Sequence, residues 1–181
     1  MAYEPWVSSD EEIWGFSETD EILWYPDSST SITWEFLGDF DACSALLGKI
    51  NSGTLESTFI NDDNKLILNE MNQTPGFCYL FYHFRVPNPS SNYFLFFRGT
   101  YGGSNNHNVE FQAFNYDTSS YTTFLILQSS TFTQDYYVDI PSGSEYFLGG
   151  TLKLRTIHND PGNSGHLFRI NYWRLIAGTA P

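Results

Sequence analysis

Residues 93–118 read YFLFFRGTYGGSNNHNVEFQAFNYDT, two apolar runs joined by a segment rich in glycine and asparagine. Aromatic and β-branched residues, which favour strands, dominate both runs. The junction TYGGSNNHN contains residues that tolerate a positive φ, as a hairpin connection requires. A phosphate-binding loop would need a helix after it and, in the Walker case, a lysine. The second run instead continues as a strand, so we predict two strands joined by a hairpin loop.

The same strand pattern extends in both directions from this stretch. Breakers such as PNPSS, DTSS, PSGS and NDPGNSG separate the apolar runs. The run at 42–50 fits either a strand or one or two helical turns, and no long helix pattern is present. About nine or ten antiparallel strands in a sandwich or barrel are therefore expected. The runs lie at 31–37, 42–50, 57–60, 65–70, 76–86, 93–99, 108–116, 121–128, 135–140, 151–158 and 166–176.

Two of these runs are apolar on both faces. In FCYLFYHF (77–84), alternate residues place Phe77, Tyr79 and Phe81 on one side and Cys78, Leu80, Tyr82 and Phe84 on the other. In YFLFF (93–97), Phe94 and Phe96 oppose three further apolar residues. A two-layer sandwich covers only one face of each sheet. We therefore expect the second face to be covered by the N-terminal segment, a neighbouring subunit or a ligand.

Residues 1–30 differ from the rest of the chain. They contain eight acidic residues, no basic residue, and the tryptophans Trp6, Trp14 and Trp24. Residues 1–63 hold 14 acidic residues and one basic residue, so they contribute 1 − 14 = −13, the net charge of the whole chain. Three tryptophans are costly to leave in water. We predict an extended arm at 1–30, with a short helix as an alternative around DEEIWGF or ETDEILW, whose tryptophans dock on their own domain or on a partner.

Composition excludes several classes of partner. Residues 64–181 are electrically balanced, with seven acidic and seven basic residues, so no basic stripe exists to bind nucleic acid. No apolar stretch is long enough to span a membrane, and MAYEPWVSSDEE lacks a secretory signal pattern. We expect synthesis in a host cytoplasm. Cys43 and Cys78 match no metal or redox spacing and are expected to be buried thiols, with a disulfide the less favoured alternative.

Two sets of residues could in principle ligate a metal ion. His158 and His166 flank NDPGNSG, a predicted loop between the last two strands, and Asp160 lies within it. Asp39, Asp41, Asp62 and Asp63 offer oxygen ligands for calcium but lack an EF-hand pattern. Turn-rich loops assemble such groups by accident, and turn carboxylates are usually solvated. We therefore expect no metal and no cofactor.

No catalytic set stands out. A glycosidase needs two carboxyl groups at a defined separation, one of them desolvated, whereas most acidic residues here lie in the polar N-terminal third. GNSGH (162–166) has neither the spacing nor the strand–helix context of a nucleophile elbow. We expect a protein that is not an enzyme.

One pattern in the opening stretch resembles a known family. Y-x-L-x-F-x-G-x-Y-G-G-x-x-x-H-N-V-E-x-Q-x-x-N-Y, followed by a terminal strand GHLFRINYWRLI (165–176), resembles galactose-binding-like jelly rolls. Its positions are Tyr93, Leu95, Phe97, Gly99, Tyr101, His107, Asn108, Val109, Gln112, Asn115 and Tyr116. The resemblance covers residues 31–177 and implies a non-catalytic jelly-roll β-sandwich at 31–181, as in carbohydrate-binding modules and phage head and tail proteins.

Two functions follow from these features. The first is a virion structural protein, a phage capsid decoration or fibre component on the virion surface. It would assemble as a homo-oligomer, with a trimer as the first expectation, and its arm would clip onto the major capsid protein or another virion protein. The alternative is a carbohydrate-binding module. Its glycan would contact loop groups at Tyr101, Asn105, His107, Tyr116 and Tyr121.

Overall fold

The computed structural model describes two units of the chain, Met1–Thr33 and Trp34–Pro181. Side chains are described for residues 46–60, 62–83, 92–178 and 180, and backbone alone for residues 6–7, 13–16, 22–23, 35–36 and 42–45. The first unit contains a small antiparallel sheet in the order β1 (Trp6–Val7), β2 (Ile13–Phe16) and β3 (Ile22–Leu23). Trp6 is the register partner of Trp14. The helix considered for this segment is therefore replaced by strands at 13–16 and 22–23, and Trp24 lies outside the described residues.

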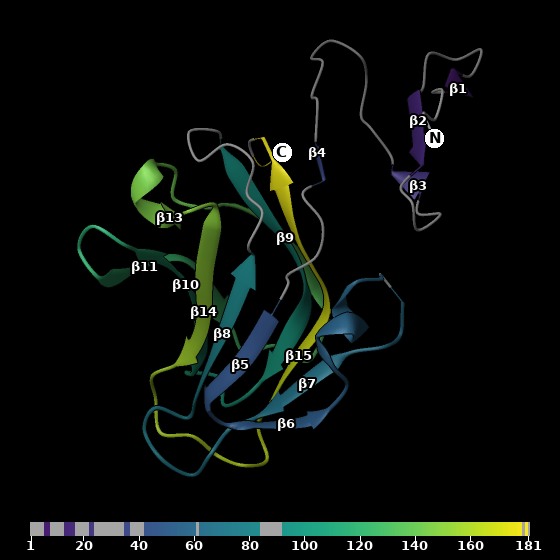
Figure 1. The fold of residues 1–181 in the computed structure, drawn as a ribbon. Coiled ribbons are helices and arrows are strands. Elements are labelled where there is room, and N and C mark those ends of the chain that lie inside the picture. The colour runs from purple at the N-terminus through teal and green to yellow at the C-terminus, as the bar shows by residue number, and fades with distance from the viewer. Residues whose placement is uncertain are drawn as a thin grey trace. The chain divides into compact units, whose positions relative to one another are not determined.

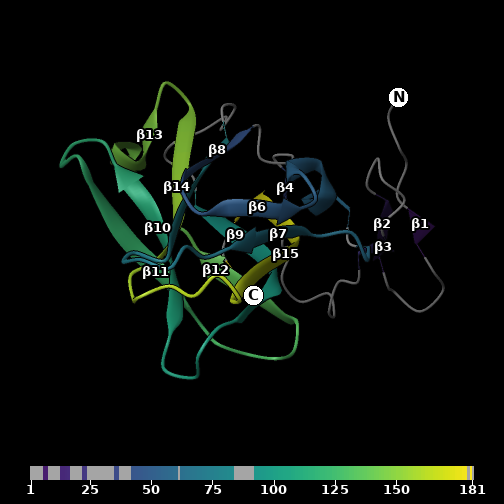
Figure 2. The ribbon, with the colours of Figure 1, turned by 90° about the horizontal axis from the view of Figure 1, so that it is seen from below.

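The second unit is a sandwich of two antiparallel sheets (Figures 1 and 2). One, here called the β10 sheet, has the order β11 (Ser120–Gln128), β10 (Asn108–Asn115), β14 (Thr151–His158), β8 (Phe77–His83) and β5 (Ala42–Leu47). The short strand β13 (Phe147–Leu148) also pairs with β14. All of these pairings are antiparallel.

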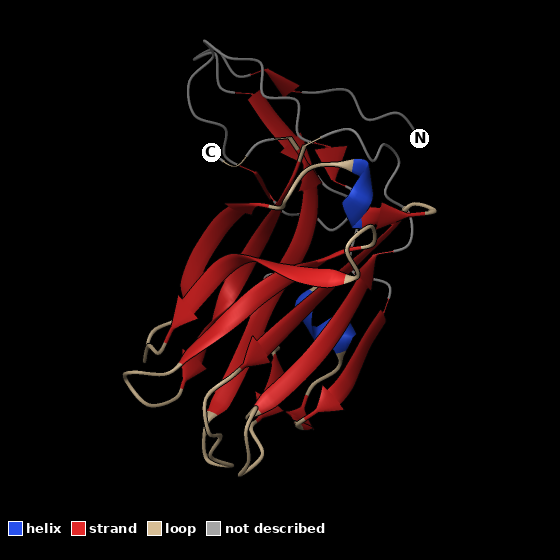
Figure 3. Cartoon of the chain, turned by 90° about the vertical axis from the view of Figure 1, so that its left-hand side faces the viewer, coloured by secondary structure: helices blue, strands red, loops and turns tan. Residues whose placement is uncertain are grey.

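The other sheet, here called the β9 sheet, has the order β12 (Gln134–Asp139), β9 (Tyr93–Gly102), β15 (Leu167–Ala177), β7 (Leu66–Asn69) and β6 (Lys49–Ser52). The short strand β4 (Glu35–Phe36) pairs with the far end of β15. Two single-turn 3₁₀ helices, η1 (Leu55–Thr58) and η2 (Ser144–Tyr146), accompany the strands (Figure 3). The predicted antiparallel jelly-roll β-sandwich is confirmed. No helix among the described residues has the length and apolar character that crossing a membrane requires.

The core lies between the two sheets and is rich in aromatic residues. Phe77, Tyr79 and Phe81, which the alternation placed on one face of β8, point into it, opposite Leu95 and Phe97 of β9. At its centre Trp173 stacks on Phe81 with ring centroids 4.4 Å apart, and Phe111 stacks on Trp173 at 5.4 Å. These rings bury large apolar areas, which dominate the stability of the core. The residues that alternate with these along each strand point to the outer faces of the sheets.

The outer face of the β9 sheet is covered over much of its area. Phe94, Tyr172 and Ile176 lie on this face, yet each is at most 2% exposed. Part of the cover near β15 comes from the chain after β6, where Arg174 Nη2 donates a hydrogen bond to the carbonyl of Phe59 at 2.8 Å. The outer face of the β9 sheet is therefore largely covered, as expected for an apolar face. The chain that follows β6 provides part of this cover. Oligomer formation and docking of the N-terminal arm stay predictions.

Two local predictions were wrong. The run at 57–60 does not form a strand, because the chain folds into η1 at Leu55–Thr58. Two hydrogen bonds close that turn, from the Ser57 amide to the Thr54 carbonyl and from the Thr54 amide to the Ser57 hydroxyl, both at 3.1 Å. Short polar side chains compete in this way with strand pairing.

The junction TYGGSNNHN is a turn but not a hairpin. It leads from β9 in one sheet to β10 in the other, so the two strands are not hydrogen-bonded neighbours. NDPGNSG likewise connects β14 to β15 across the sandwich. Turn residues show that the chain reverses, but not which sheet the next strand joins. Both crossings lie at one end of the sandwich, where β7, β9 and β14 end and β10 and β15 begin.

Candidate functional site

Two groups of polar and aromatic side chains have the features of a binding site. The first lies on the outer face of the β10 sheet. Val109, Phe111 and Ala113 of β10 point into the core, so the residues between them point outward. We call this group the sheet-face cluster; it consists of Glu110, Gln112, Phe114, Tyr121, Lys153 and Arg155.

The aromatic part of the sheet-face cluster is built around Phe114. Its ring meets the edges of Tyr116 and Tyr121 at centroid distances of 5.0 and 4.9 Å, and all three rings are partly exposed. The Arg155 guanidinium carbon lies 3.7 Å from the centroid of Tyr121, and Lys153 Nζ lies 4.5 Å from that of Phe114. Cations over ring faces are held by the ring quadrupole. They keep the rings fixed on the sheet.

The polar part of the cluster is a connected hydrogen-bond network. Arg155 Nε donates to Gln112 Oε1 at 2.5 Å, and Gln112 Nε2 donates to Glu110 Oε2 at 2.7 Å. Glu110 also accepts hydrogen bonds from the Thr123 hydroxyl at 2.9 Å and from Asn159 Nδ2 at 2.7 Å. Arg155 therefore links the rings to the polar side chains, and the two parts form one surface.

The ionisation of this surface follows from its contacts. Burial alone would raise the pKa of Glu110, but the hydrogen bonds from Thr123, Asn159 and Gln112, together with the charge of Arg155, lower it overall. Burial raises the pKa of Tyr121 despite the nearby Arg155. At neutral pH the cluster thus offers a carboxylate acceptor beside a phenol that keeps its proton.

The second group lies at the end of the sandwich where the crossings meet. We call it the end cluster; it consists of Glu70, Tyr101, His107, His158, Asp160 and His166. Glu70 directly follows β7, Tyr101 lies in β9 and His158 in β14, and the two crossing loops supply the others. Segments far apart in sequence therefore converge on one set of titratable side chains.

Glu70 is the centre of the end cluster. Its side chain is 0% exposed, and it accepts hydrogen bonds from the Tyr101 hydroxyl at 2.5 Å and from the Asn163 amide at 2.7 Å. His166 Nδ1 lies 3.1 Å from Glu70 Oε2, and His158 Nδ1 lies 3.1 Å from Oε1. The His158 contact is close but not aligned as a hydrogen bond, and that nitrogen forms none with the described residues. Charge and hydrogen bonding are concentrated on a carboxylate with no access to water.

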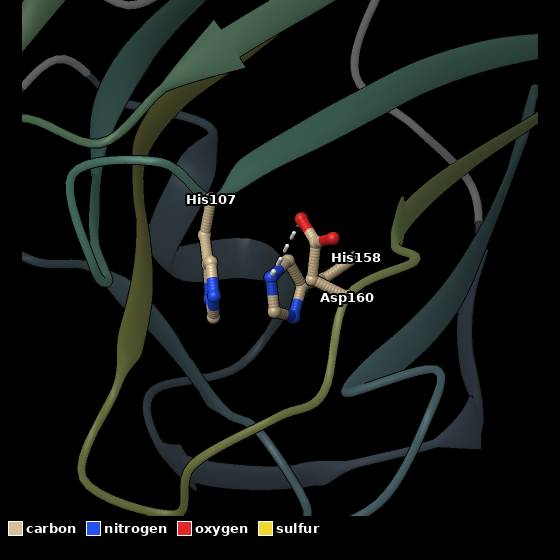
Figure 4. A group of neighbouring side chains, drawn as sticks. All are labelled: His107, His158 and Asp160. Atoms are coloured by element: carbon tan, nitrogen blue, oxygen red, sulfur yellow. Dashed lines mark ion pairs between the residues drawn. The ribbon is translucent and has the colours of Figure 1, made fainter.

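His158 connects Glu70 to the rest of the end cluster. Its Nε2 lies 3.1 Å from the Tyr101 hydroxyl and 3.8 Å from Asp160 Oδ2. The His107 ring is its neighbour, with centroids 5.0 Å apart (Figure 4). Burial is the largest influence on His158 and lowers its pKa, although Glu70 and Asp160 act in the opposite direction.

Two glycines make room for this arrangement. A Cβ on Gly103 would lie 2.2 Å from Cζ of the Tyr101 ring, and a Cβ on Gly76 would lie 2.4 Å from His158 Nδ1. Neither glycine has a positive φ. The expectation that the junction needs glycine for its backbone conformation was therefore wrong, because Gly103 is required there for space.

The structure divides the five predicted glycan-binding residues between the two groups. Tyr116 and Tyr121 lie around Phe114 on the sheet face. Tyr101 and His107 belong to the end cluster, and Asn105 is exposed in the loop before His107. Tyr101 is 0% exposed and therefore has no ring face on which a sugar could stack. Tyr121 and Tyr116 are the aromatic members of the set whose rings solvent partly reaches.

The remaining sequence candidates are placed as follows. Cys78 is a free, buried thiol, and burial raises its pKa; the side chain of Cys43 lies outside the described residues. Asp62 accepts hydrogen bonds from the Asn64 amide at 2.8 Å and from Asn64 Nδ2 at 2.7 Å, which is a turn role. Asp63 is exposed, and Asp39 and Asp41 lie outside the described residues.

Sequence reasoning missed several residues of both groups. It did not single out Phe114 or Arg155, and it named Gln112 only as a position of the jelly-roll pattern. The alternation in NVEFQAFNY (108–116) places Gln112 and Phe114 on the outer face of their strand. Nothing in the sequence indicates that Glu70 is buried, because it stands between an apolar run and a polar turn, where an exposed carboxylate is expected. His158 and His166, which flank NDPGNSG, both contact Glu70, and a crossing between the sheets brings them to it.

Comparison with known proteins finds a likeness in fold and none in sequence. No protein-family model and no curated protein matches the chain in sequence. Among solved structures, a mutant family 29 carbohydrate-binding module complexed with cellulohexaose is similar, with a TM-score of 0.50 and 10% identity over 80% of this chain and 89% of that chain. A second mutant of that module gives a TM-score of 0.50 and 11% identity over 81% and 92%. At this identity the likeness shows that the chain shares the β-sandwich fold of these modules.

Proposed function

We propose that the protein is a carbohydrate-binding module that holds a polysaccharide chain against the outer face of the β10 sheet. One observation carries the proposal: Tyr121 and Phe114, both partly exposed, lie beside a connected set of donors and acceptors. In this set Arg155 and Glu110 are partly exposed, and the buried Gln112 links them. A sugar ring presents apolar C–H faces and a rim of hydroxyl groups. Aromatic rings with a few fixed polar groups are suited to both.

The width of the face favours a chain over a single sugar. Its outward residues come from three neighbouring strands, β11, β10 and β14, whose pairing places Tyr121 opposite Phe114 and Arg155 opposite Gln112. Adjacent strands lie about 4.8 Å apart. The rings and the polar groups therefore span more than one sugar unit, and the family 29 module with the same fold is complexed with a hexasaccharide.

Binding rather than hydrolysis suits the ionisation of this face. A glycosidase needs a general acid whose pKa is raised, with a second carboxyl group about 5–9.5 Å away. Glu110 is the carboxylate on the outward side of the described strands β11, β10, β14 and β8, and hydrogen bonds lower its pKa. It is built to accept hydrogen bonds from sugar hydroxyls and not to donate a proton.

The proposal is tested by measuring the affinity of the full chain for cellohexaose and for a panel of soluble β-linked polysaccharides, by calorimetry and by affinity electrophoresis. Tyr121→Ala should weaken binding about tenfold or more, equivalent to ~1.4 kcal/mol, because it removes a stacking surface and releases Arg155. Arg155→Ala should have a similar effect, since Gln112 then loses its donor.

Tyr137→Ala is the matched control. Tyr137 is 44% exposed on the outer face of the other sheet, where it stacks on Phe96 with ring centroids 4.6 Å apart. Its loss should leave sugar affinity unchanged. Equal losses in the Tyr121 and Tyr137 variants, or no binding to any member of the panel, would overturn the proposal.

The virion role stays a separate hypothesis. It rests on the composition of residues 1–30 and on the expected oligomer with a capsid partner. Light scattering on the full chain and on a chain lacking residues 1–30 checks it. A concentration-independent oligomer that requires the arm would support it, and a full-length monomer would exclude the trimer.

A further inference from the structure

We propose that His107, His158 and Asp160 of the end cluster bind a divalent transition metal ion of the zinc class. This site is distinct from the sugar-binding face and does not depend on it. Each of the three residues offers one ligand atom, and these atoms all lie within 4.8 Å of one another. Figure 4 shows the two rings beside each other and the carboxylate of Asp160 next to His158.

The hydrogen bonds around His158 cannot satisfy both of its ring nitrogens, and a bound cation would satisfy the second one. The single proton of the Tyr101 hydroxyl is donated to Glu70, so toward His158 Nε2 this oxygen can only accept. His158 Nδ1 faces Glu70 Oε1, which is also an acceptor. A neutral imidazole carries one proton, and either tautomer therefore leaves one ring nitrogen facing an acceptor with no hydrogen between them.

A metal ion on Nε2 resolves this conflict. The imidazole proton then lies on Nδ1, 3.1 Å from Glu70 Oε1, where a rotation of the ring is needed to align it as a hydrogen bond. The ion takes the position on Nε2 that the Tyr101 hydroxyl, 3.1 Å away, now faces. Histidines that ligate metals commonly donate their other ring proton to a carboxylate, which fixes the tautomer and orients the ring. Glu70 is 0% exposed and hydrogen-bonded to Tyr101 and Asn163, so it is held in place for this role.

His107 provides an independent observation. Its Nδ1 is buried and has no hydrogen-bond partner among the described residues. An unpaired buried nitrogen costs free energy. Its ring lies 5.0 Å from that of His158, on the side of the cluster that also holds Asp160. Coordination would give this nitrogen a partner.

The ligand chemistry favours zinc or a similar ion over calcium or magnesium. Two imidazoles and one carboxylate are ligands of zinc, at about 2.0–2.2 Å, whereas calcium takes six to eight oxygens. Bonds of that length bring the ligand atoms to about 3.3 Å from one another. The side chain of Asp160 is 45% exposed, so it is free to close onto the ion and leaves a path from solvent. With three protein ligands, the fourth position is left to water.

The site would fasten both crossing loops to the sandwich. His107 ends the crossing from β9 to β10, and Asp160 lies in the crossing from β14 to β15. A ligand that binds only the folded state raises its stability in proportion to the logarithm of its concentration. Zinc should therefore stabilise the protein without any sugar present.

The test uses the full chain without a histidine tag, freed of metal with a chelator and titrated with Zn²⁺ by calorimetry. We expect saturable binding of one ion per chain and a Tm that rises with the Zn²⁺ concentration. Asp160→Asn and His107→Ala should each weaken zinc binding about tenfold or more. Their Tm in the absence of zinc should stay near that of the unchanged protein, because both side chains are partly exposed.

Asp135→Asn is the matched control, since the Asp135 side chain is 44% exposed and lies on β12, in the other sheet from His158. This variant should bind zinc as the unchanged chain does. The proposal is overturned if the full chain shows no saturable Zn²⁺ binding, or if Asp160→Asn and Asp135→Asn bind zinc equally. Sugar affinity measured on the same samples keeps the two proposals separable.

Discussion

The end cluster and the sheet-face cluster each hold a carboxylate that accepts several hydrogen bonds, but they differ in burial. Glu70 in the end cluster is closed off from water and accepts from Tyr101 and the Asn163 amide. Glu110 on the sheet face is partly exposed and accepts from Gln112, Thr123 and Asn159. The same chemical group is therefore a structural centre in one place and a contact surface in the other.

Burial also decides which ligand each group suits. A small ion can enter a compact set of imidazoles and carboxylates, where few water molecules compete for it. A sugar chain needs an open face with rings and a rim of donors and acceptors. The two clusters are adjacent in sequence at residues 158–160. Asn159 donates a hydrogen bond to Glu110 of the sheet-face cluster, and its neighbours His158 and Asp160 belong to the end cluster.

The largest contrast between the clusters is expected from removing each carboxylate. Glu70→Ala leaves the Tyr101 hydroxyl and the Asn163 amide without their acceptor inside the protein, and we expect it to cost about 3–5 kcal/mol of unfolding free energy. Glu110→Ala should cost less than about 1 kcal/mol, since water can replace its role. Urea denaturation of both variants measures the difference. Similar losses in the two variants would show that burial does not separate the clusters.

The next effect tests the space that glycine leaves beside Tyr101. Gly103→Ala places a Cβ against the Tyr101 ring and should cost about 1–3 kcal/mol through displacement of the ring from Glu70. Gly102→Ala is the control, because its Cβ would meet the flexible end of Arg169 at 3.2 Å and the Leu167 carbonyl oxygen at an ordinary contact distance of 3.7 Å. Thermal unfolding of the two variants provides the comparison. A stable Gly103→Ala protein with an unchanged Tyr101 environment would contradict the tight fit.

The fold could be predicted from the sequence because its signal is local. Alternation in FCYLFYHF and YFLFF correctly divided the side chains of β8 and β9 between two faces, and breakers marked the strand ends. Pairing between strands is not local. Nothing in TYGGSNNHN distinguishes a return to the same sheet from a crossing to the other, so the predicted hairpin was wrong.

The sites were harder to predict for the same reason. Tyr121 was identified from its residue type, and the register places it beside Phe114, which alternation alone could have indicated. Glu70 and His107 lie 37 residues apart in sequence and share a cluster only because three strands end together, while Tyr101 is buried by contacts that no local pattern encodes. The residue type shows what a side chain can bind, whereas the strand topology decides which side chains lie together in one site.

The smallest effect concerns the response of the sheet face to acid. Hydrogen bonds lower the pKa of Glu110 in the folded protein, whereas in the unfolded chain it has its ordinary value of 4.5. The unfolded state therefore binds more protons between these two values, and the stability that Glu110 provides is present above pH 4.5 and lost as the pH falls through the folded pKa.

Glu110→Gln should remove this part of the acid sensitivity, so the stability difference between variant and unchanged protein shrinks from pH 6 to pH 3. The expected change is about 0.5 kcal/mol, as for exposed charge pairs. Asp117→Asn, in the exposed turn after β10, is the control and should run parallel to the unchanged protein. If the stability difference between Glu110→Gln and the unchanged protein does not vary with pH, the hydrogen bonds of this face do not depend on the charge of Glu110. The affinity for sugar should then be equally insensitive to acid, which calorimetry at pH 6 and pH 4 would detect in the same samples.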